Sequence, residues 1–173
     1  MRAILGIHSS VTKTGSSSNP VSYISSSDGH AWISLRVMGV TETYSLYPDN
    51  NPRIRQSGRD VSRKTTDIRK NFEIDERRRA LENRYYGLDS LQLMKLKALL
   101  RLNVRHRVTE NCASWAAETV REVTGRNIKA DERILRFIES PRRLSRHIVK
   151  LEHIRKTSIT DPIPPLPEPK EKE

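Results

Sequence analysis

Cys112 has the clearest capacity for covalent chemistry, and it is the only cysteine in the chain. Apolar residues recur at three- and four-residue steps after it and stop at Gly125, which predicts a helix with Asn111 as its N-cap. Cys112 then lies in the first helical turn, where the helix dipole and free backbone N–H groups favour the nucleophilic thiolate. A lone cysteine is also an ordinary small core residue, so a catalytic role requires a base.

His30 is the histidine best placed to be that base. Residues 30–37 alternate between apolar and other side chains, which predicts a strand that begins at His30 just after Gly29. The imidazole lies on the face opposite Ala31 and Ile33. A strand-edge histidine without a special role is the competing interpretation. The remaining histidines lie in basic or weakly patterned segments: His8, His106, His147 and His153.

A hairpin is expected directly after the His30 strand. If Met38 and Gly39 form a two-residue turn, residues 41–47 pair back on the first strand, and Ser45 and Thr43 share the face of His30. Further strands are expected at 1–8 and, weakly, at 21–24 within a polar loop that spans 9–28.

Several helices and links are expected in the rest of the chain. Residues 53–84 are dense in Arg and Lys, and acids interrupt the run, so we expect a solvated loop and then a surface helix near 72–84 rather than a nucleic-acid-binding arm. The acids are Asp67, Glu73, Asp75, Glu76 and Glu82. A stronger helix is predicted at 88–102, capped by Asp89 or Ser90, with an apolar stripe at Leu88, Leu91, Met94 (or Lys95), Ala98 and Leu102. An extended link is expected at 104–108, and helices at 131–139 and about 141–155.

Composition limits the class of protein. The chain has 173 residues, of which 35% are hydrophobic, enough for one modest core. We expect one domain at 1–158 and a proline-rich tail at 159–173 that is disordered or docks as a strand. Lys and Arg number 32 against 21 Asp and Glu, a net charge of +11 that favours polyanionic surfaces such as anionic lipid or an acidic protein. One cysteine excludes an intramolecular disulfide.

The motifs together resemble those of a known enzyme group. The order Gly29-His30-Ala31-Trp32-Ile33-Ser34-Leu35, then Thr43-Tyr44-Ser45-Leu46-Tyr47-Pro48, then Asn111-Cys112-Ala113-Ser114-Trp115 resembles the circularly permuted papain-like (NlpC/P60) branch, which includes lecithin:retinol acyltransferase-like enzymes. The resemblance spans roughly residues 22–125. It implies an α+β fold with an antiparallel sheet packed on helices, and a Cys112–His30 dyad without metal or cofactor.

The same resemblance implies a third polar group that orients the histidine from the next strand. The family's common spacing points to Glu42, and a carboxylate orients an imidazole better than a hydroxyl does. The hairpin register instead favours Ser45, which shares the face of His30. Both assignments stay open, with Glu42 as the choice.

Relatives of this group cut phospholipid esters, transfer acyl groups between lipids, or cut peptidoglycan amides. The Asn-Cys pair and the His-before-Cys order resemble the lipid-acting branch, so we expect a phospholipase-like hydrolase or acyltransferase, with a peptidoglycan amidase as the alternative. A non-catalytic basic adaptor that binds through its arginine-rich segment is the second alternative, and a protease acting on host or rival proteins is a third.

The motif order also resembles antibacterial toxins of type VI secretion, which implies a secretion carrier and an acidic immunity protein. The first 30 residues lack the apolar region of a signal peptide. We therefore expect synthesis in the bacterial cytoplasm and delivery by a secretion system into the periplasm or to the membrane surface of a target cell. The missing signal peptide fits a cytoplasmic protein as well.

Overall fold

The structure is a computed structural model that describes residues 3–10, 29–48, 66–106, 111–129 and 140–166. The strand expected at 21–24 and the helix expected at 131–139 lie outside these residues. The described part contains five strands and four helices, so the prediction of an α+β chain with an antiparallel sheet packed on helices is confirmed.

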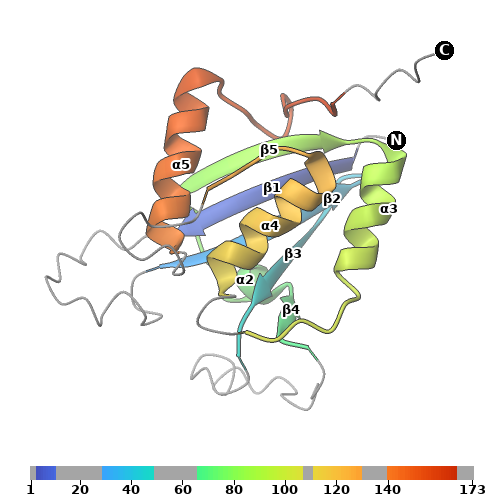
Figure 1. The fold of residues 1–173 in the computed structure, drawn as a ribbon, viewed down its shortest axis with the longest axis vertical. Helices are drawn as coiled ribbons and strands as arrows, with labels where there is room; N and C mark the ends of the chain where they lie inside the picture. The colour runs from blue at the N-terminus through green and yellow to red at the C-terminus, as the bar shows by residue number, and fades with distance from the viewer. Residues whose placement is uncertain (1–2, 11–28, 49–65, 107–110, 130–139, 167–173) are drawn as a thin grey trace, which may run out of the picture.

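All five strands form one antiparallel sheet (Figure 1). Their order in the sheet is β4-β3-β2-β1-β5, so the first strand of the chain lies between the His30 strand and the last one. The strands are β1 (Ala3–Ser10), β2 (His30–Val37), β3 (Val40–Leu46), β4 (Ile68–Lys70) and β5 (Glu82–Leu88).

The hairpin of β2 and β3 is formed as expected. Val37 pairs with Val40 across the turn at Met38 and Gly39, and both turn residues have positive φ, at 52° and 85°. A two-residue turn of this kind needs positive φ at its central positions, and glycine adopts it without strain. The same register places Ser34 opposite Thr43, which fixes which β3 side chains share a face with His30.

One face of the sheet is covered by α3 (Ser90–Leu99), α4 (Cys112–Thr124) and α5 (Pro141–Ile154). Apolar side chains from these helices and from alternate positions of β1 and β2 form a single core. The short helix α2 (Phe72–Asp75) lies behind the sheet in Figure 1, against β3. The sheet therefore separates the main core from a smaller cluster that contains Tyr47 and Phe72.

The helix expected at 72–84 is wrong over most of its length. Only Phe72–Asp75 is helical, and Glu82–Leu88 instead forms the edge strand β5, paired with β1. The charged and polar residues of β5 do not show the apolar alternation of a strand. Arg84 is buried all the same, because it forms an ion pair with Glu152 at 2.7 Å. Pairing with β1 outweighs the local helical pattern.

The helix expected at 88–102 is present as the shorter α3, Ser90–Leu99, but a different side of it packs against the core. Asp89 caps α3 through a capping box with Gln92, as the sequence suggested. The stripe expected to face the core is instead exposed at Leu91 (68%) and Met94 (67%), while Leu96 is fully buried. The apolar residues of this helix lie on all of its sides, so its sequence does not determine which side is buried. Packing against α4 determines it.

The helix at 141–155 is confirmed as α5, which Ser140 caps through a hydrogen bond from the N–H of Arg143. The segment after it returns to the sheet. Ile163 is buried and exchanges backbone hydrogen bonds with Tyr85 and Gly87 at 3.0 and 2.7 Å. The packed core therefore extends past residue 158, and the structure favours docking for the first half of the proline-rich segment.

Candidate active site

Cys112 is the first residue of α4, as predicted. The Asn111 side chain caps the helix by accepting hydrogen bonds from the backbone N–H groups of Ala113 and Ser114 at 2.9 and 3.2 Å. Gly125 ends the helix at φ 69°, in the left-handed conformation that favours glycine. The cap uses two of the free N–H groups at the start of the helix, and the N–H of Cys112 is not one of them.

His30 begins β2 at the same end of the sheet, and its imidazole forms a hydrogen bond with the Cys112 thiol. The thiol also accepts a hydrogen bond from the backbone N–H of Ala31. Gly29 allows this arrangement, because its φ of 118° turns the chain sharply into the strand. The structure therefore brings together the two residues that the sequence singled out.

Glu73, which stands in the sequence as one of several acids within a basic run, completes the constellation. Its Oε1 lies 3.2 Å from His30 Nε2, and both side chains are buried, at 2% and 6% exposure. Nε2 therefore faces the carboxylate, which leaves Nδ1 for the sulfur of Cys112. Three side chains from α4, β2 and α2 thus form a Cys–His–Glu chain.

Asn71 fixes Glu73 in place. It has a left-handed backbone conformation, with φ 58°, directly before α2. Its Oδ1 accepts a hydrogen bond from Thr43 N at 2.9 Å, and its N–H donates to Thr43 O at 2.7 Å. This double contact clamps the start of α2 to β3, so Glu73 is delivered to the sheet face on which His30 lies.

Aromatic rings hold the His30 imidazole from two sides. The ring stacks on Tyr47 at a centroid distance of 4.1 Å and on Trp32 at 5.9 Å. Phe72 in turn meets Tyr47 edge to face at 5.0 Å. These contacts restrict the rotation of the imidazole and exclude water from its contact with Glu73.

The electrostatics favour a thiolate–imidazolium pair. Burial alone lowers the pKa of His30, but the charges and hydrogen bonds of Cys112 and Glu73 raise that pKa above its ordinary value. Burial alone raises the pKa of Cys112, but His30 and the backbone N–H groups of Ala31 and Ala113 bring it below its ordinary value. Each group therefore stabilises the charged form of the other.

Neither residue that was expected to orient His30 contacts it. Glu42 pairs with Leu35 and so projects from the opposite face of the sheet, where it accepts hydrogen bonds from Tyr44 Oη and Lys70 Nζ at 2.6 Å each. Those two partners lower its pKa. Ser45 lies on the face of His30 and is fully buried, but its Oγ has no hydrogen-bond partner among the described residues.

The sequence contains one weak signal for Glu73. Phe72 is the only aromatic residue between Tyr47 and Tyr85, and an aromatic side chain within a charged run marks a point where the chain must turn inward. The acid beside it is then carried inward too. Of the other histidines, His106 lies close enough for its pKa to be influenced by His30.

No group of residues in the described ranges has the composition of a metal site, and no helix among them is long and apolar enough to cross a membrane. No protein-family model, curated protein or solved structure matches the chain. The fold and the site together define an α+β protein in which a half-buried cysteine at the start of a helix lies beside a buried His–Glu pair.

Proposed function

We propose that the chain is a cysteine acyl hydrolase or acyltransferase of the permuted papain-like type, with phospholipid as its substrate class. The observation that supports it best is the hydrogen-bonded chain Cys112–His30–Glu73, in which a helix-start thiol meets an imidazole backed by a buried carboxylate. The His-strand-before-Cys-helix order and the antiparallel sheet agree with that fold.

The proposed reaction has two halves. The Cys112 thiolate attacks the acyl carbon, and the backbone N–H of Cys112 stabilises the oxyanion. The His30 imidazolium then gives its proton to the departing alkoxide, and the acyl group stays on Cys112 as a thioester. A water molecule, or the hydroxyl of an acceptor lipid, loses its proton to His30 and attacks the thioester. The acid or the new ester leaves, and the Cys112 thiolate is restored.

Glu73 acts through His30 as a positioning residue in this scheme. A carboxylate at Nε2 keeps the imidazole in the orientation that presents Nδ1 to sulfur, and it stabilises the imidazolium. Burial of the pair at 2% and 6% exposure strengthens that interaction relative to water. No residue is required to hold a cofactor or metal.

The net charge of +11 fits an anionic bilayer, because each basic residue near an anionic surface contributes on the order of 1 kcal/mol to binding. Peptidoglycan is acidic too, so the charge does not decide between the two substrates. The resemblance to toxins of type VI secretion suggests the biological setting: delivery by a carrier, and inhibition by an acidic immunity protein that covers the cleft near Cys112. Coexpression with a neighbouring gene product tests that setting. Failure of every neighbour to bind or protect counts against it.

The decisive experiment compares substrates and variants side by side. Anionic liposomes and purified sacculi are incubated with the wild-type chain, Cys112→Ser and His30→Ala, and the products are identified by mass spectrometry. We expect fatty acid or acyl-transfer products from liposomes, lost in both variants, because a serine hydroxyl is not ionised in a site tuned to a thiolate.

The other outcomes are equally clear. Products from sacculi alone would make the chain a peptidoglycan amidase. Charge reversal of Arg77, Arg78 and Arg79 distinguishes a basic adaptor, whose effect on cells would vanish in that variant and persist in Cys112→Ser. A folded Cys112→Ser protein with wild-type activity would end the cysteine-enzyme hypothesis.

A further inference from the structure

Helix α3 has two apolar faces, and only one of them is used in the fold. Leu96 is fully buried, and Leu93 and Leu99 pack against the main core beside it. On the other side, Leu91 and Met94 are 68% and 67% exposed. Large apolar side chains scattered singly on a surface are common, but two of them one helical turn apart form a continuous stripe.

Basic residues border this stripe on both sides. At 3.6 residues per turn, Leu91, Met94 and the exposed Ala98 lie in the middle of the outer surface, with Lys95 on one side and Lys97 on the other. Leu102, 54% exposed, and Arg101 extend the surface just beyond the helix. We call these residues the α3 outer face: Leu91, Met94, Lys95, Lys97, Ala98, Arg101 and Leu102.

The segment is also free of acids. None of residues 90–106 is Asp or Glu. Among the described residues, the ion pair on this helix joins Lys95 Nζ to Glu122 Oε2 at 3.4 Å, with both side chains about half exposed. Apolar side chains in the middle, with long cationic side chains at the border, are the pattern of helices that lie in a membrane interface and reach the headgroups with their charges.

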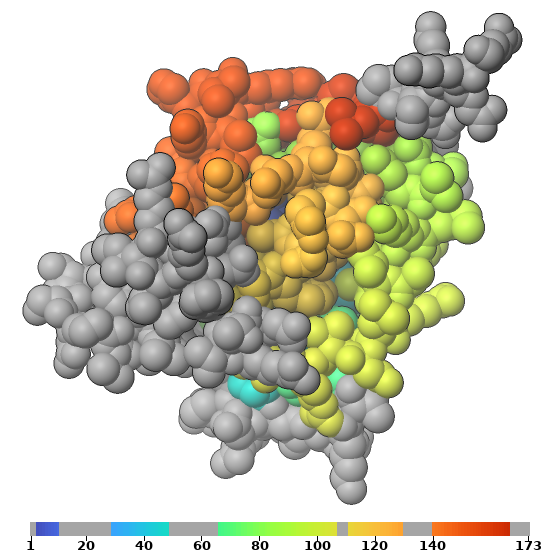
Figure 2. Space-filling view, viewed as in Figure 1, coloured from blue at the N-terminus to red at the C-terminus, as the bar shows by residue number. Residues whose placement is uncertain are grey.

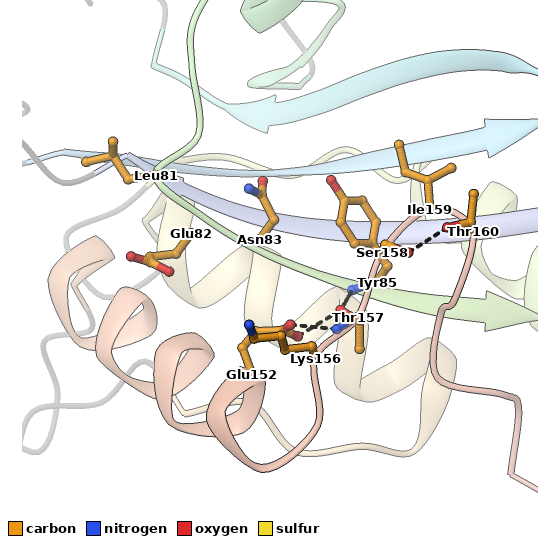
Figure 3. A pocket seen from close by; sticks show the side chains of 10 residues that line it. All are labelled: Leu81, Glu82, Asn83, Tyr85, Glu152, Lys156, Thr157, Ser158, Ile159 and Thr160. Atoms are coloured by element: carbon orange, nitrogen blue, oxygen red, sulfur yellow. Dashed lines mark hydrogen bonds between the residues drawn. The ribbon is translucent and has the colours of Figure 1, made fainter.

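The segment that follows α3 runs toward the candidate site. Figure 2 shows α3 along the right-hand edge of the visible surface, and Figure 1 shows the segment after it running to the end of the sheet where α4 begins. His106, at the end of that segment, is influenced by the charge of His30. The described segment after α3 therefore ends close to His30, at the same end of the sheet as Cys112.

We propose that the α3 outer face binds the surface of an anionic phospholipid bilayer. The proposal rests on the proposed lipid substrate for its purpose and names the surface through which that substrate is reached. Charge complementarity supports a bilayer as the occupant, because the stripe and its basic border match apolar chains beneath anionic headgroups. A second copy of the chain is a poor partner, because two molecules of charge +11 repel each other.

Binding can be measured without catalysis. The full chain with Cys112→Ser is sedimented with vesicles of phosphatidylcholine alone and with vesicles that contain phosphatidylglycerol. We expect binding to the anionic vesicles only, weakened by salt. In this background, Leu91→Gln with Met94→Gln, and separately Lys97→Glu with Arg101→Glu, should each lower the partition coefficient about tenfold or more.

The matched control is on α5, where Val149 and Ile154 are 45% and 75% exposed near Lys150 and Arg155. Val149→Gln with Ile154→Gln should bind like the parent protein. Circular dichroism checks that each variant folds. If the double variant at Leu91 and Met94 does not fold, the single variants Leu91→Gln and Met94→Gln are used instead.

The proposal is overturned if folded α3 variants bind like the parent, if the α5 control loses binding equally, or if sedimentation velocity shows that α3 instead mediates self-association. Capture of an acidic protein by α3 in the absence of vesicle binding overturns it too. If vesicles are bound through α3 but only sacculi are cut, the lipid substrate fails while the binding surface stands.

Discussion

His30 and His8 occupy similar positions on one face of the sheet, yet their pKa values are shifted in opposite directions. In the register of β1 and β2, His8 pairs with Trp32 and Ser10 pairs with His30, so both imidazoles project from the same face. Trp32 stacks on both rings, at centroid distances of 5.4 Å to His8 and 5.9 Å to His30. Both histidines are buried, at 7% and 5% exposure.

The difference lies in the partners. His8 Nδ1 lies 2.6 Å from Asn83 Oδ1 and Nε2 lies 2.7 Å from Ser34 Oγ, so a neutral amide and a hydroxyl satisfy its ring. Burial then dominates and lowers the pKa of His8 to about 4. His30 has a thiol and a carboxylate as partners, and its pKa is raised.

The comparison shows that hydrogen-bonding partners alone do not keep a buried imidazole basic. Burial penalises the imidazolium at both positions, and only a charged partner compensates for it. The Ser34–His8–Asn83 chain therefore joins β1, β2 and β5, whereas the charges around Cys112, His30 and Glu73 favour a thiolate–imidazolium pair.

Among substitutions at the partners of the two histidines, Glu73→Gln should have the largest effect, because it gives His30 an amide partner like that of His8. We expect activity to fall roughly 10²- to 10⁴-fold, by analogy with the loss of the carboxylate from other nucleophile–histidine–carboxylate sites. The pKa of His30 should fall and that of Cys112 should rise, because the imidazolium loses its buried counter-charge. The rate of iodoacetamide alkylation against pH measures the thiolate directly.

Glu42→Gln is the matched control, because it makes the same chemical change on the opposite face of the sheet. It breaks the contact with Lys70 and weakens that with Tyr44, which should cost no more than about 1 kcal/mol of stability at this exposed pair. Activity and the alkylation profile should match the wild type. Equal damage from both variants would remove Glu73 from the site.

Cys112 and His30 are predictable from the sequence because each lies in an element with clear local periodicity, and a cap or a glycine marks its start. Glu73 is not, because its position depends on the Asn71 clamp between α2 and β3, a contact between segments 28 residues apart. The choice between Glu42 and Ser45 also fails for a local reason. Both candidates lie on the neighbouring strand β3, whereas the carboxylate that contacts His30 belongs to α2, outside the sheet.

The fold shows the same division between local and distant causes. The hairpin, the cap of α4 and the start of α5 follow from turn and cap residues, and all are present. The strand at 82–88 and the orientation of α3 do not follow. Burial of Arg84 in β5 requires its ion pair with Glu152 on α5. The apolar residues of α3 lie on all of its sides, so contacts with distant segments determine which side is buried.

His8→Gln should change stability rather than activity. A pKa near 4 in the folded state, against 6.5 in the unfolded state, means that the unfolded chain binds a proton first as the pH falls. The contribution of neutral His8 is therefore complete above pH 6.5 and is lost between pH 6.5 and 4, on the order of 3 kcal/mol in total. In His8→Gln this part of the acid dependence should disappear.

Urea unfolding at pH 7.0 and pH 4.5, for both proteins, measures that difference. Gln offers a donor and an acceptor to the neighbours of His8. Gly6 leaves room for the side chain at position 8, since a Cβ at Gly6 would lie 2.6 Å from His8 Nε2. If the two proteins lose the same free energy of unfolding between these pH values, His8 is not the buried neutral group described here.

Asn83→Asp should have the smallest effect, and it makes the converse change, because it gives His8 a carboxylate like that of His30. The new charge should raise the pKa of His8 from about 4 toward its ordinary value. The shift should be less complete than at His30, because Asn83 is only partly buried and solvent screens its side chain. An NMR titration of the His8 ring protons follows it directly.

Catalysis should not appear at Ser34, because a hydroxyl is far less acidic than a thiol and the N–H groups around it belong to paired strands rather than to a helix start. A titration that stays near 4 would mean that burial, and not the partner, sets the difference between the two histidines.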